Sequence, residues 1–259
     1  MSDVEVFIGF DPRERMAWNV CARSLLAHSS YPPPVQPIAR VPLQGLALYT
    51  RPTGQAHGLW DEISKAPMAT EFALARFFVP FVSHARWALY VDGDFLFRAD
   101  VGELFRLADP RFAVQVVKHE HAPEETVKMD GQAQSAYPRK NWSSAILWNL
   151  RHIGNGPRYS IRDANAKPGL WLHSFGWLKD EEIGDLPLHW NWLEGSSTRE
   201  IEPKAVHYTR GTPDLPGYGD SAYADEWFRY LTAAEHLAYE GERLTYERER
   251  CAQARSATG

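Results

Sequence analysis

Short apolar segments alternate with a helical pattern along the N-terminal half of the chain, and no other feature constrains the fold as strongly. Residues 4–10 form an apolar run that stops at Gly9 and Asp11-Pro12. Residues 14–28 then repeat apolar side chains at helical spacing, and residues 35–41 form a second β-type run. A strand, a helix and a strand in this order are typical of the βαβ unit of a parallel sheet. We therefore predict an α/β fold with a mostly parallel central sheet flanked by helices.

The rest of the chain continues this pattern and then weakens it. Residues 87–91 are almost wholly apolar, as central parallel strands are. The spacing predicts further elements, namely helices over 71–82, 101–108 and 225–250, strands over 112–117 and 145–150, and a loop over the Gly-, Pro- and Thr-rich residues 42–70. No repeat or linker divides the chain, so we predict a single domain over residues 1–259.

Composition and charge narrow the class of protein. The formal net charge of -5 argues against a nucleic-acid binder, because neutralising phosphates requires a surplus of Lys and Arg. Two distant cysteines, Cys21 and Cys251, favour reduced thiols over a disulfide framework. The sequence has neither a signal-peptide pattern at its start nor an apolar stretch long enough to span a membrane. We expect a cytoplasmic protein that would reach a membrane-located acceptor only peripherally.

Asp92-Gly93-Asp94 directly follows the apolar run at 87–91. Open parallel sheets bind ligands beyond the carboxyl ends of their strands. Two carboxylates placed there suit Mg²⁺ or Mn²⁺, which can bridge to a diphosphate, and Gly93 lets the backbone approach the ligand closely. A capped surface turn is the alternative interpretation of such a triplet. We predict a metal–diphosphate site with Asp92 and Asp94 as ligands.

Three segments around this triplet resemble the central block of the family 8 glycosyltransferases and their bacterial and phage relatives. They are residues 75–80, 88–94 and 100–105, and the resemblance extends to residues 6–11 and 205–211. It implies a GT-A nucleotide-sugar-binding fold, with a nucleotide-binding half over about 1–110 and an acceptor-side half over about 111–259. It also implies transfer of a hexose, expected from a UDP-linked donor and with retention, to an acceptor glycan, lipid or protein.

The resemblance assigns roles to residues outside the triplet. His207 would complete the metal site, with Gly211 in the loop after it, and a histidine beside two carboxylates favours Mn²⁺ over Mg²⁺. Arg76 would lie near the donor diphosphate, because a guanidinium suits phosphate oxygens. The nucleobase would be bordered by Gly9, Phe10 and Asp11. An equal alternative for this last group is a plain turn in which Asp11 caps the following helix.

Two polar segments are candidates for the reacting side of the site. Asn141 stands where the family's asparagine touches the transferred sugar, although serine replaces the usual glycine after it. His173 stands where the family has an acidic pair near the anomeric carbon. We therefore take Asn141 and His173 as the candidate catalytic residues. The segment 190–192 (Trp-Asn-Trp) could form a platform for an acceptor sugar or pack a loop onto the sheet. Because tryptophan side chains are usually largely buried, packing is favoured.

Two other functions remain open from the sequence. A nucleotidyltransferase would use a similar fold, but its glycine-rich basic loop after the first strand is matched poorly by residues 9–13. A non-catalytic carbohydrate-binding protein would explain the loss of the acidic pair at His173-Ser174. We therefore favour the hypothesis of a metal-dependent glycosyltransferase.

Overall fold

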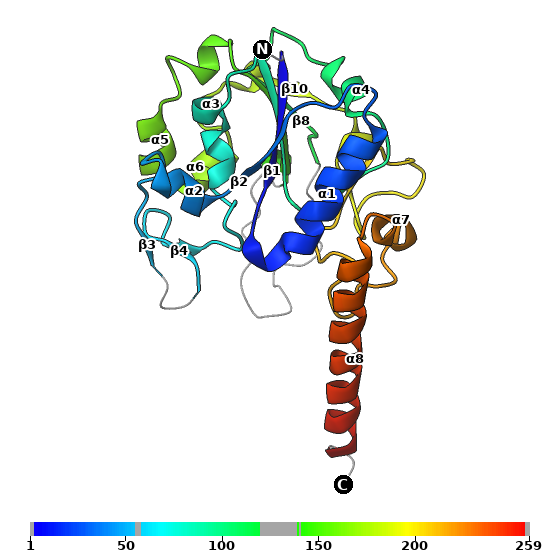
Figure 1. The fold of residues 1–259 in the computed structure, drawn as a ribbon. Coiled ribbons are helices and arrows are strands. Elements are labelled where there is room, and N and C mark those ends of the chain that lie inside the picture. Colours follow the sequence, from blue (N-terminus) through cyan, green and yellow to red (C-terminus); the bar gives the residue numbers. More distant parts are fainter. Residues whose placement is uncertain (1–2, 55–57, 120–138, 140, 257–259) are drawn as a thin grey trace.

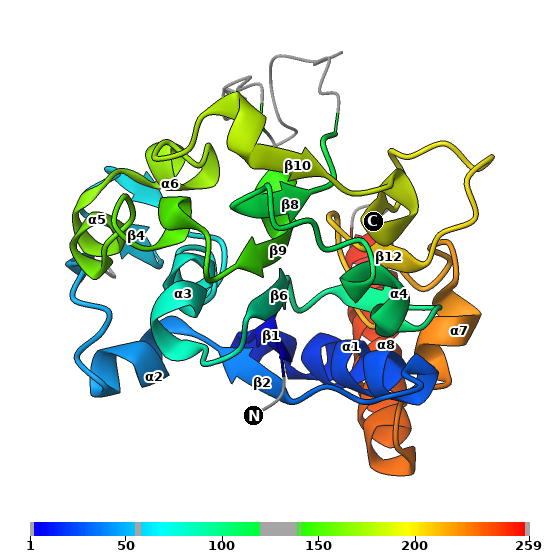
Figure 2. The same cartoon turned by 90° about the horizontal axis from the view of Figure 1, so that it is seen from above.

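The computed structural model describes residues 3–54, 58–119, 139 and 141–256, and a six-stranded sheet forms its centre (Figure 2). The strand order is β10-β8-β9-β6-β1-β2. In chain order these strands are β1 (Val4–Gly9), β2 (Val35–Ile38), β6 (Trp87–Val91), β8 (Val114–Val116), β9 (Ala145–Asn149) and β10 (Ile183–Asp185). β1 pairs in parallel with β2 and β6, and β8 with β10, whereas β9 runs antiparallel to both of its neighbours. The predicted α/β fold with a mostly parallel sheet is confirmed.

Helices lie on both faces of this sheet (Figure 2). On one side are α1 (Arg15–His28) and α4 (Val101–Phe105), and on the other are α2 (Arg40–Gly45), α3 (Val79–Val82), α5 (Ile161–Ala166) and α6 (Gly169–His173). Alternate side chains of β1 serve the two faces: Val6 and Ile8 pack in the core with α1, and Phe7 packs in the opposite core. The 3-10 helices are Pro12–Glu14, Ala75–Phe78, Trp142–Ser144, Ile153–Asn155, Asp180–Glu182 and Leu188–Trp190.

Two small sheets flank the central one. The first, in the order β11-β12-β7, joins β7 (Phe95–Phe97) to β11 (Trp192–Leu193) and β12 (Ala205–His207). The second consists of β3 (Thr53–Gly54), β4 (Trp60–Asp61) and β5 (Ala66–Pro67).

The second small sheet and α2 correct the prediction of a plain loop over 42–70. A buried ion pair holds this segment, because Arg51 Nη2 lies 2.6 Å from Asp61 Oδ2. The same guanidinium donates to the carbonyls of Ala164 and Lys167, both at 2.8 Å. These partners are distant in sequence, so local composition did not reveal them.

Two helices that the sequence pattern predicts as continuous are each divided into two elements in the structure. The one expected over 71–82 is a 3-10 helix followed by α3, and it continues through Pro80. The one expected over 225–250 is two helices, α7 (Ala224–Phe228) and α8 (Ala233–Ser256). A capping box starts α8: the Thr232 hydroxyl accepts from Glu235 N at 3.2 Å, and the Glu235 carboxylate accepts from Thr232 N at 2.7 Å. α8 then projects from the body (Figure 1).

Within the part of the chain that the structure describes, no helix is both long and apolar enough to cross a membrane. Cys21 is buried and free. Cys251 belongs to α8, and its side chain lies outside the described residues.

Candidate functional site

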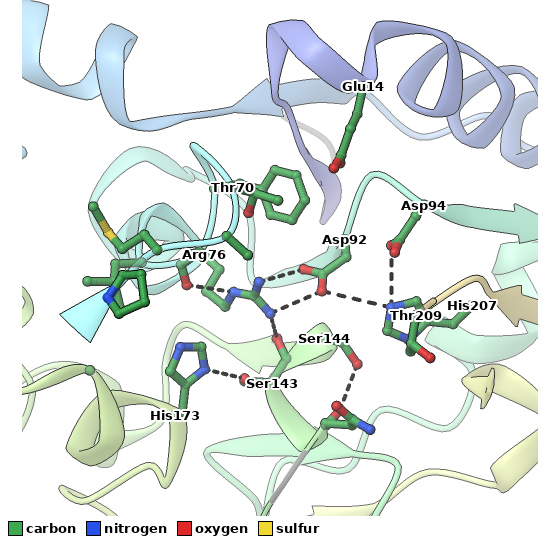
Figure 3. A pocket seen from close by; sticks show the side chains of 18 of the residues that line it. Glu14, Thr70, Arg76, Asp92, Asp94, Ser143, Ser144, His173, His207 and Thr209 are labelled. Carbon is green, nitrogen blue, oxygen red and sulfur yellow. Dashed lines mark hydrogen bonds and ion pairs between the residues drawn. The ribbon is translucent and has the colours of Figure 1, made fainter. Parts of the chain in front are cut away.

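A cavity of about 600 Å³ opens beside the carboxyl end of β6. Seven of the predicted site residues line it: Arg76, Asp92, Asp94, Asn141, His173, His207 and Gly211. Their side chains come from both halves of the chain, and Figure 3 shows Asp92, Asp94 and His207 converging on one side of the cavity, with His173 on the other. Gly9, Phe10, Asp11 and Gly93 do not belong to the lining.

Strand pairing places His207 beside the acidic triplet. β6 ends immediately before Asp92, and β7 begins immediately after Asp94. β7 pairs antiparallel with β12 so that Phe95 lies opposite His207, and Tyr208 N donates to the Asp94 carbonyl at 3.1 Å. The imidazole ring stacks on the Phe95 ring with centroids 4.4 Å apart. The register of this pair therefore determines where the imidazole lies.

The three side chains present ligand atoms to one another. His207 Nε2 lies 3.3 Å from Asp94 Oδ1 and 4.0 Å from Asp92 Oδ2. Asp94 Oδ1 is buried and accepts no hydrogen bond within the described structure. Because a buried polar atom without a hydrogen bond is unfavourable, this oxygen is suited to contact a positively charged group.

A hydrogen-bond chain behind His207 orients its ring. The Ser144 hydroxyl donates to the Asn141 carbonyl at 2.7 Å and accepts from Asn191 Nδ2 at 2.9 Å. Asn191 Oδ1 lies 2.9 Å from His207 Nδ1. Because an amide oxygen can only accept, we assign Nδ1–H as the donor of this hydrogen bond. In the neutral ring, Nε2 therefore directs a lone pair at the two carboxylates, which is favourable only with a positive charge between them.

The donor set fits a divalent cation. One ligand atom from each of Asp92, Asp94 and His207 lies within 4.8 Å of the other two. Metal–oxygen and metal–imidazole bonds of about 2.0–2.2 Å would bridge such separations with little movement. Two carboxylates and one imidazole form a mixed oxygen and nitrogen set that suits Mn²⁺ or Mg²⁺.

Arg76 holds Asp92 in place. Its Nη2 lies 2.9 Å and its Nη1 3.3 Å from the two carboxylate oxygens, and Tyr90 Oη donates to Asp92 Oδ1 at 2.6 Å. The guanidinium also donates to the carbonyls of Ser143 and Ala73, at 2.8 and 3.0 Å. Burial raises the pKa of the Asp92 carboxyl, the Arg76 charge opposes this shift, and the Asp94 carboxylate adds to it. Asp92 Oδ2 is the oxygen that remains turned toward His207.

The residues expected to border a nucleobase lie differently. The Asp11 carboxylate accepts from Arg13 N at 2.9 Å and from Glu71 N at 3.0 Å, and it pairs with the Arg13 guanidinium at 2.6 Å. This is the capping arrangement that the sequence left as the alternative. The Phe10 ring packs edge-on against Trp18, with centroids 5.9 Å apart.

Gly9 and Gly93 bring two backbone segments into contact beside the acidic triplet. A Cβ on Gly93 would lie 2.5 Å from the Gly9 carbonyl oxygen, and one on Gly9 would lie 2.6 Å from the Phe72 ring. The glycine inside the acidic triplet therefore permits close packing of the turn on β1.

We expect Gly93→Ala to lower the free energy of unfolding by about 1–3 kcal/mol, because the clash is with backbone that cannot rotate away. Urea denaturation followed by circular dichroism measures this change. Gly45→Ala is the matched control, since its Cβ would meet nothing within 4 Å. An equal denaturation midpoint for both variants would contradict the tight approach.

His173 lies on the side of the cavity away from Asp94 and His207 (Figure 3), whereas the Asn141 carbonyl is joined through Ser144 to the hydrogen-bond chain behind His207. His173 Nδ1 lies 2.7 Å from the Ser143 hydroxyl, and its ring contacts Phe77 edge-on. Burial, followed by the Arg76 charge, lowers the pKa of His173 to about 3, so the imidazole is neutral at physiological pH. Asn141 has a left-handed backbone with φ of 63°. Both residues are placed where they can touch a ligand, and their catalytic roles stay predictions.

The sequence did not indicate Glu14 or Tyr90 as parts of this site, and it indicated Asn191 only within the segment 190–192. Glu14 lines the cavity, and burial together with the nearby Asp94 raises its pKa to about 7. Tyr90 was visible in principle, because it precedes Asp92 by two residues in an extended segment and such residues share one face. Asn191 is fully buried behind His207. Trp190 and Trp192 on either side of it are also buried, which confirms the packing interpretation of this segment.

Comparison with known proteins yields one sequence relative and several similar structures. No family model matches the chain. The chain is 43% identical over 233 residues to Protein CDI of Arabidopsis thaliana, which covers 87% of this chain and 85% of that protein. The bifunctional glycosyltransferase WbbM in its apo form is similar with a TM-score of 0.59 and 16% identity, and the match covers 92% of this chain. The chain spans about half the length of WbbM, 51%.

A second solved structure matches over nearly its whole length. It is the galactosyltransferase LgtC in complex with donor and acceptor sugar analogs, with a TM-score of 0.56, 12% identity and coverage of 91% of this chain and 99% of LgtC. At 16% and 12% sequence identity, the similarity to these two structures shows the fold alone. The chain has the GT-A type of α/β fold, with a central mixed sheet flanked by helices.

Proposed function

The chain belongs to the family of Protein CDI of Arabidopsis thaliana, and we propose that it is a divalent-cation-dependent glycosyltransferase of the family 8 type. The single observation that carries this proposal is the convergence of Asp92, Asp94 and His207 at the carboxyl end of β6, with Asp94 Oδ1 buried and accepting no hydrogen bond within the described structure. In a GT-A fold this edge of the sheet is where a nucleotide diphosphate would meet a metal. The solved structures of similar fold are named as glycosyltransferases, which supports the same assignment.

The proposed donor is a nucleotide-diphosphate hexose, with UDP as the expected nucleotide and Mn²⁺ as the expected ion. A cation held by the triad would neutralise charge on the departing diphosphate. The bond between the sugar C1 and the phosphate oxygen breaks, and its electron pair stays on the diphosphate. The acceptor hydroxyl oxygen bonds to C1 from the same face, and its proton passes to a phosphate oxygen. Retention is part of the proposal, as are an acceptor glycan, lipid or protein and a cytoplasmic location.

The chain's own residues have separate tasks in this scheme. Arg76 and Tyr90 fix the Asp92 carboxylate, and Asn191 fixes the tautomer of His207. The neutral His173 imidazole and Asn141, which both line the cavity, would hydrogen-bond hydroxyl groups of the transferred sugar. The Ser143 hydroxyl anchors His173 in this position.

We expect the melting temperature to rise by several degrees when Mn²⁺ and the correct nucleotide sugar are both present, because a ligand that binds the folded state stabilises it by mass action. A thermal-shift screen of nucleotide sugars, with and without chelator, measures this. His207→Phe keeps the ring stacked on Phe95 but removes the ligand nitrogen, so it should abolish the shift. His84→Ala, at an exposed histidine, is the control.

The released product then separates the three candidate functions. Release of the nucleoside diphosphate with sugar transfer or donor hydrolysis supports a glycosyltransferase. Pyrophosphate release from a nucleoside triphosphate would instead identify a nucleotidyltransferase. Sugar binding with no turnover of any donor would indicate a carbohydrate-binding protein. Full transferase activity in excess chelator would refute the metal dependence.

A further inference from the structure

Arg210 is a cation at the cavity wall whose hydrogen-bonding capacity is largely unused. Within the described part of the chain, the arginine and lysine side chains that line the cavity are those of Arg76 and Arg210. Arg76 is buried, and its Nε, Nη1 and Nη2 all donate to Asp92 or to backbone carbonyls. The Arg210 side chain is 58% exposed and makes one polar contact, from Nη2 to Glu194 Oε2 at 3.2 Å.

The surroundings of Arg210 fix the direction of its guanidinium. The Glu194 side chain is only 9% exposed, so its carboxylate holds the guanidinium from the protein side. Gly195 has φ of +73°, and a Cβ built there would lie 2.0 Å from Arg210 Nη2. The absence of a side chain at Gly195 therefore leaves the space that the guanidinium occupies. One edge faces Glu194, and the other N–H groups remain for a ligand in the cavity.

The charges in and around the triad favour a further cation near the diphosphate. Asp92 is neutralised by Arg76, so a divalent cation on the triad faces the Asp94 charge and the diphosphate. When the sugar departs, the diphosphate gains a further negative charge. Arg210 follows His207 by three residues, in the loop that leaves β12 toward the same cavity. A guanidinium matches two phosphate oxygens at once, which a histidine or an amide does not.

We propose that Arg210, aimed by Glu194, binds the diphosphate of the nucleotide donor and stabilises it as it leaves; this inference rests on the proposed function. Glu194 is a positioning residue in this arrangement, and Arg210 contacts the leaving group itself. The guanidinium keeps its bond to Glu194 when the ligand binds, because its free N–H groups suffice for the phosphate oxygens.

Titration calorimetry in the presence of Mn²⁺ tests the proposal without turnover. The ligands are UDP, or GDP, ADP or CDP if one of these binds the wild type more tightly, and inorganic pyrophosphate. Arg210→Gln should weaken the binding of the nucleoside diphosphate and of pyrophosphate by the same factor. The expected factor is about tenfold to a hundredfold, since one charge-assisted contact to the diphosphate is lost. Arg210→Lys should recover part of the affinity. Arg111→Gln, an exposed arginine paired with Asp109 outside the cavity lining, should match the wild type.

The two hypotheses fail in different ways. If the wild type binds a nucleoside diphosphate with Mn²⁺ and Arg210→Gln binds it within twofold, the role of Arg210 is overturned and the proposed function stands. The role of Arg210 is also overturned if the variant loses affinity for the nucleoside diphosphate but not for pyrophosphate, because the contact would then be with the nucleoside. If the wild type binds no nucleoside diphosphate with Mn²⁺, both the proposed function and this inference fall.

Discussion

Asp94→Asn should lower the rate of sugar transfer on the order of a thousandfold, because in the proposed function the variant loses one of the two carboxylates that would hold the cation against the diphosphate. Its free energy of unfolding should stay unchanged or rise slightly. The Asp94 oxygen that faces His207 has no hydrogen-bond donor within the described structure, so an amide in its place removes repulsion with Asp92. Turnover at saturating Mn²⁺ and urea denaturation with chelator measure the two effects.

Asp109→Asn provides the matched control for this variant. Asp109 undergoes the same chemical change, but it pairs with the exposed Arg111 outside the cavity lining. Both its turnover and its denaturation midpoint should equal those of the wild type. Transfer by Asp94→Asn within tenfold of the wild type would contradict a metal-ligating role, and a large loss of stability would point to a structural turn.

Arg76→Met should produce the largest loss of stability, about 3–5 kcal/mol, because it leaves the Asp92 carboxylate buried next to Asp94 without its counter-ion. The substitution also removes the donors to the Ser143 and Ala73 carbonyls. Mn²⁺ should restore part of this stability, since a cation on the triad supplies a positive charge to the same carboxylate. Urea denaturation with Mn²⁺ and with chelator measures both effects.

Arg111→Met tests whether this loss is specific to the buried pair. Arg111 lies in an exposed ion pair with Asp109, and exposed pairs contribute little to stability. We expect its denaturation midpoint to remain near that of the wild type, with or without Mn²⁺. If Arg76→Met unfolds at the same urea concentration as Arg111→Met, the Arg76–Asp92 pair does not stabilise the fold.

The parts of the fold that depend on local periodicity were predictable from the sequence. The apolar run at 87–91 is the fully buried β6, and the alternation over 4–41 gives β1, α1 and β2. The segment over 42–70 was not predictable in this way, because the Arg51–Asp61 pair that organises it also binds carbonyls on and after α5. The capping box of Thr232 and Glu235 was readable, but the continuous helical pattern over 225–250 obscured it.

The candidate site was predictable only where its residues follow one another. Asp92 and Asp94 follow a buried strand, so the residues themselves indicate a ligand site. His207 required the family resemblance, because the pairing of β12 with β7 leaves no trace in either segment alone. Asp11 remained ambiguous, since its capping partners include Glu71 N, which is distant in sequence. The sequence alone did not link Arg210 to Glu194, because their contact and the space that Gly195 leaves for the guanidinium appear only in the folded chain.

The antiparallel pairing of β7 with β12 also sets when the site can form. During folding, β1, β2 and β6 can associate soon after the N-terminal half is available, and Asp92 and Asp94 then lie at the end of a formed strand. His207 reaches them only after a long intervening chain has closed into a loop, which is entropically unfavourable until the contacts of β12 compensate for it. If the triad binds a cation as proposed, its affinity should therefore develop late in refolding, after most of the helical signal, and metal binding would then report completion of the native structure.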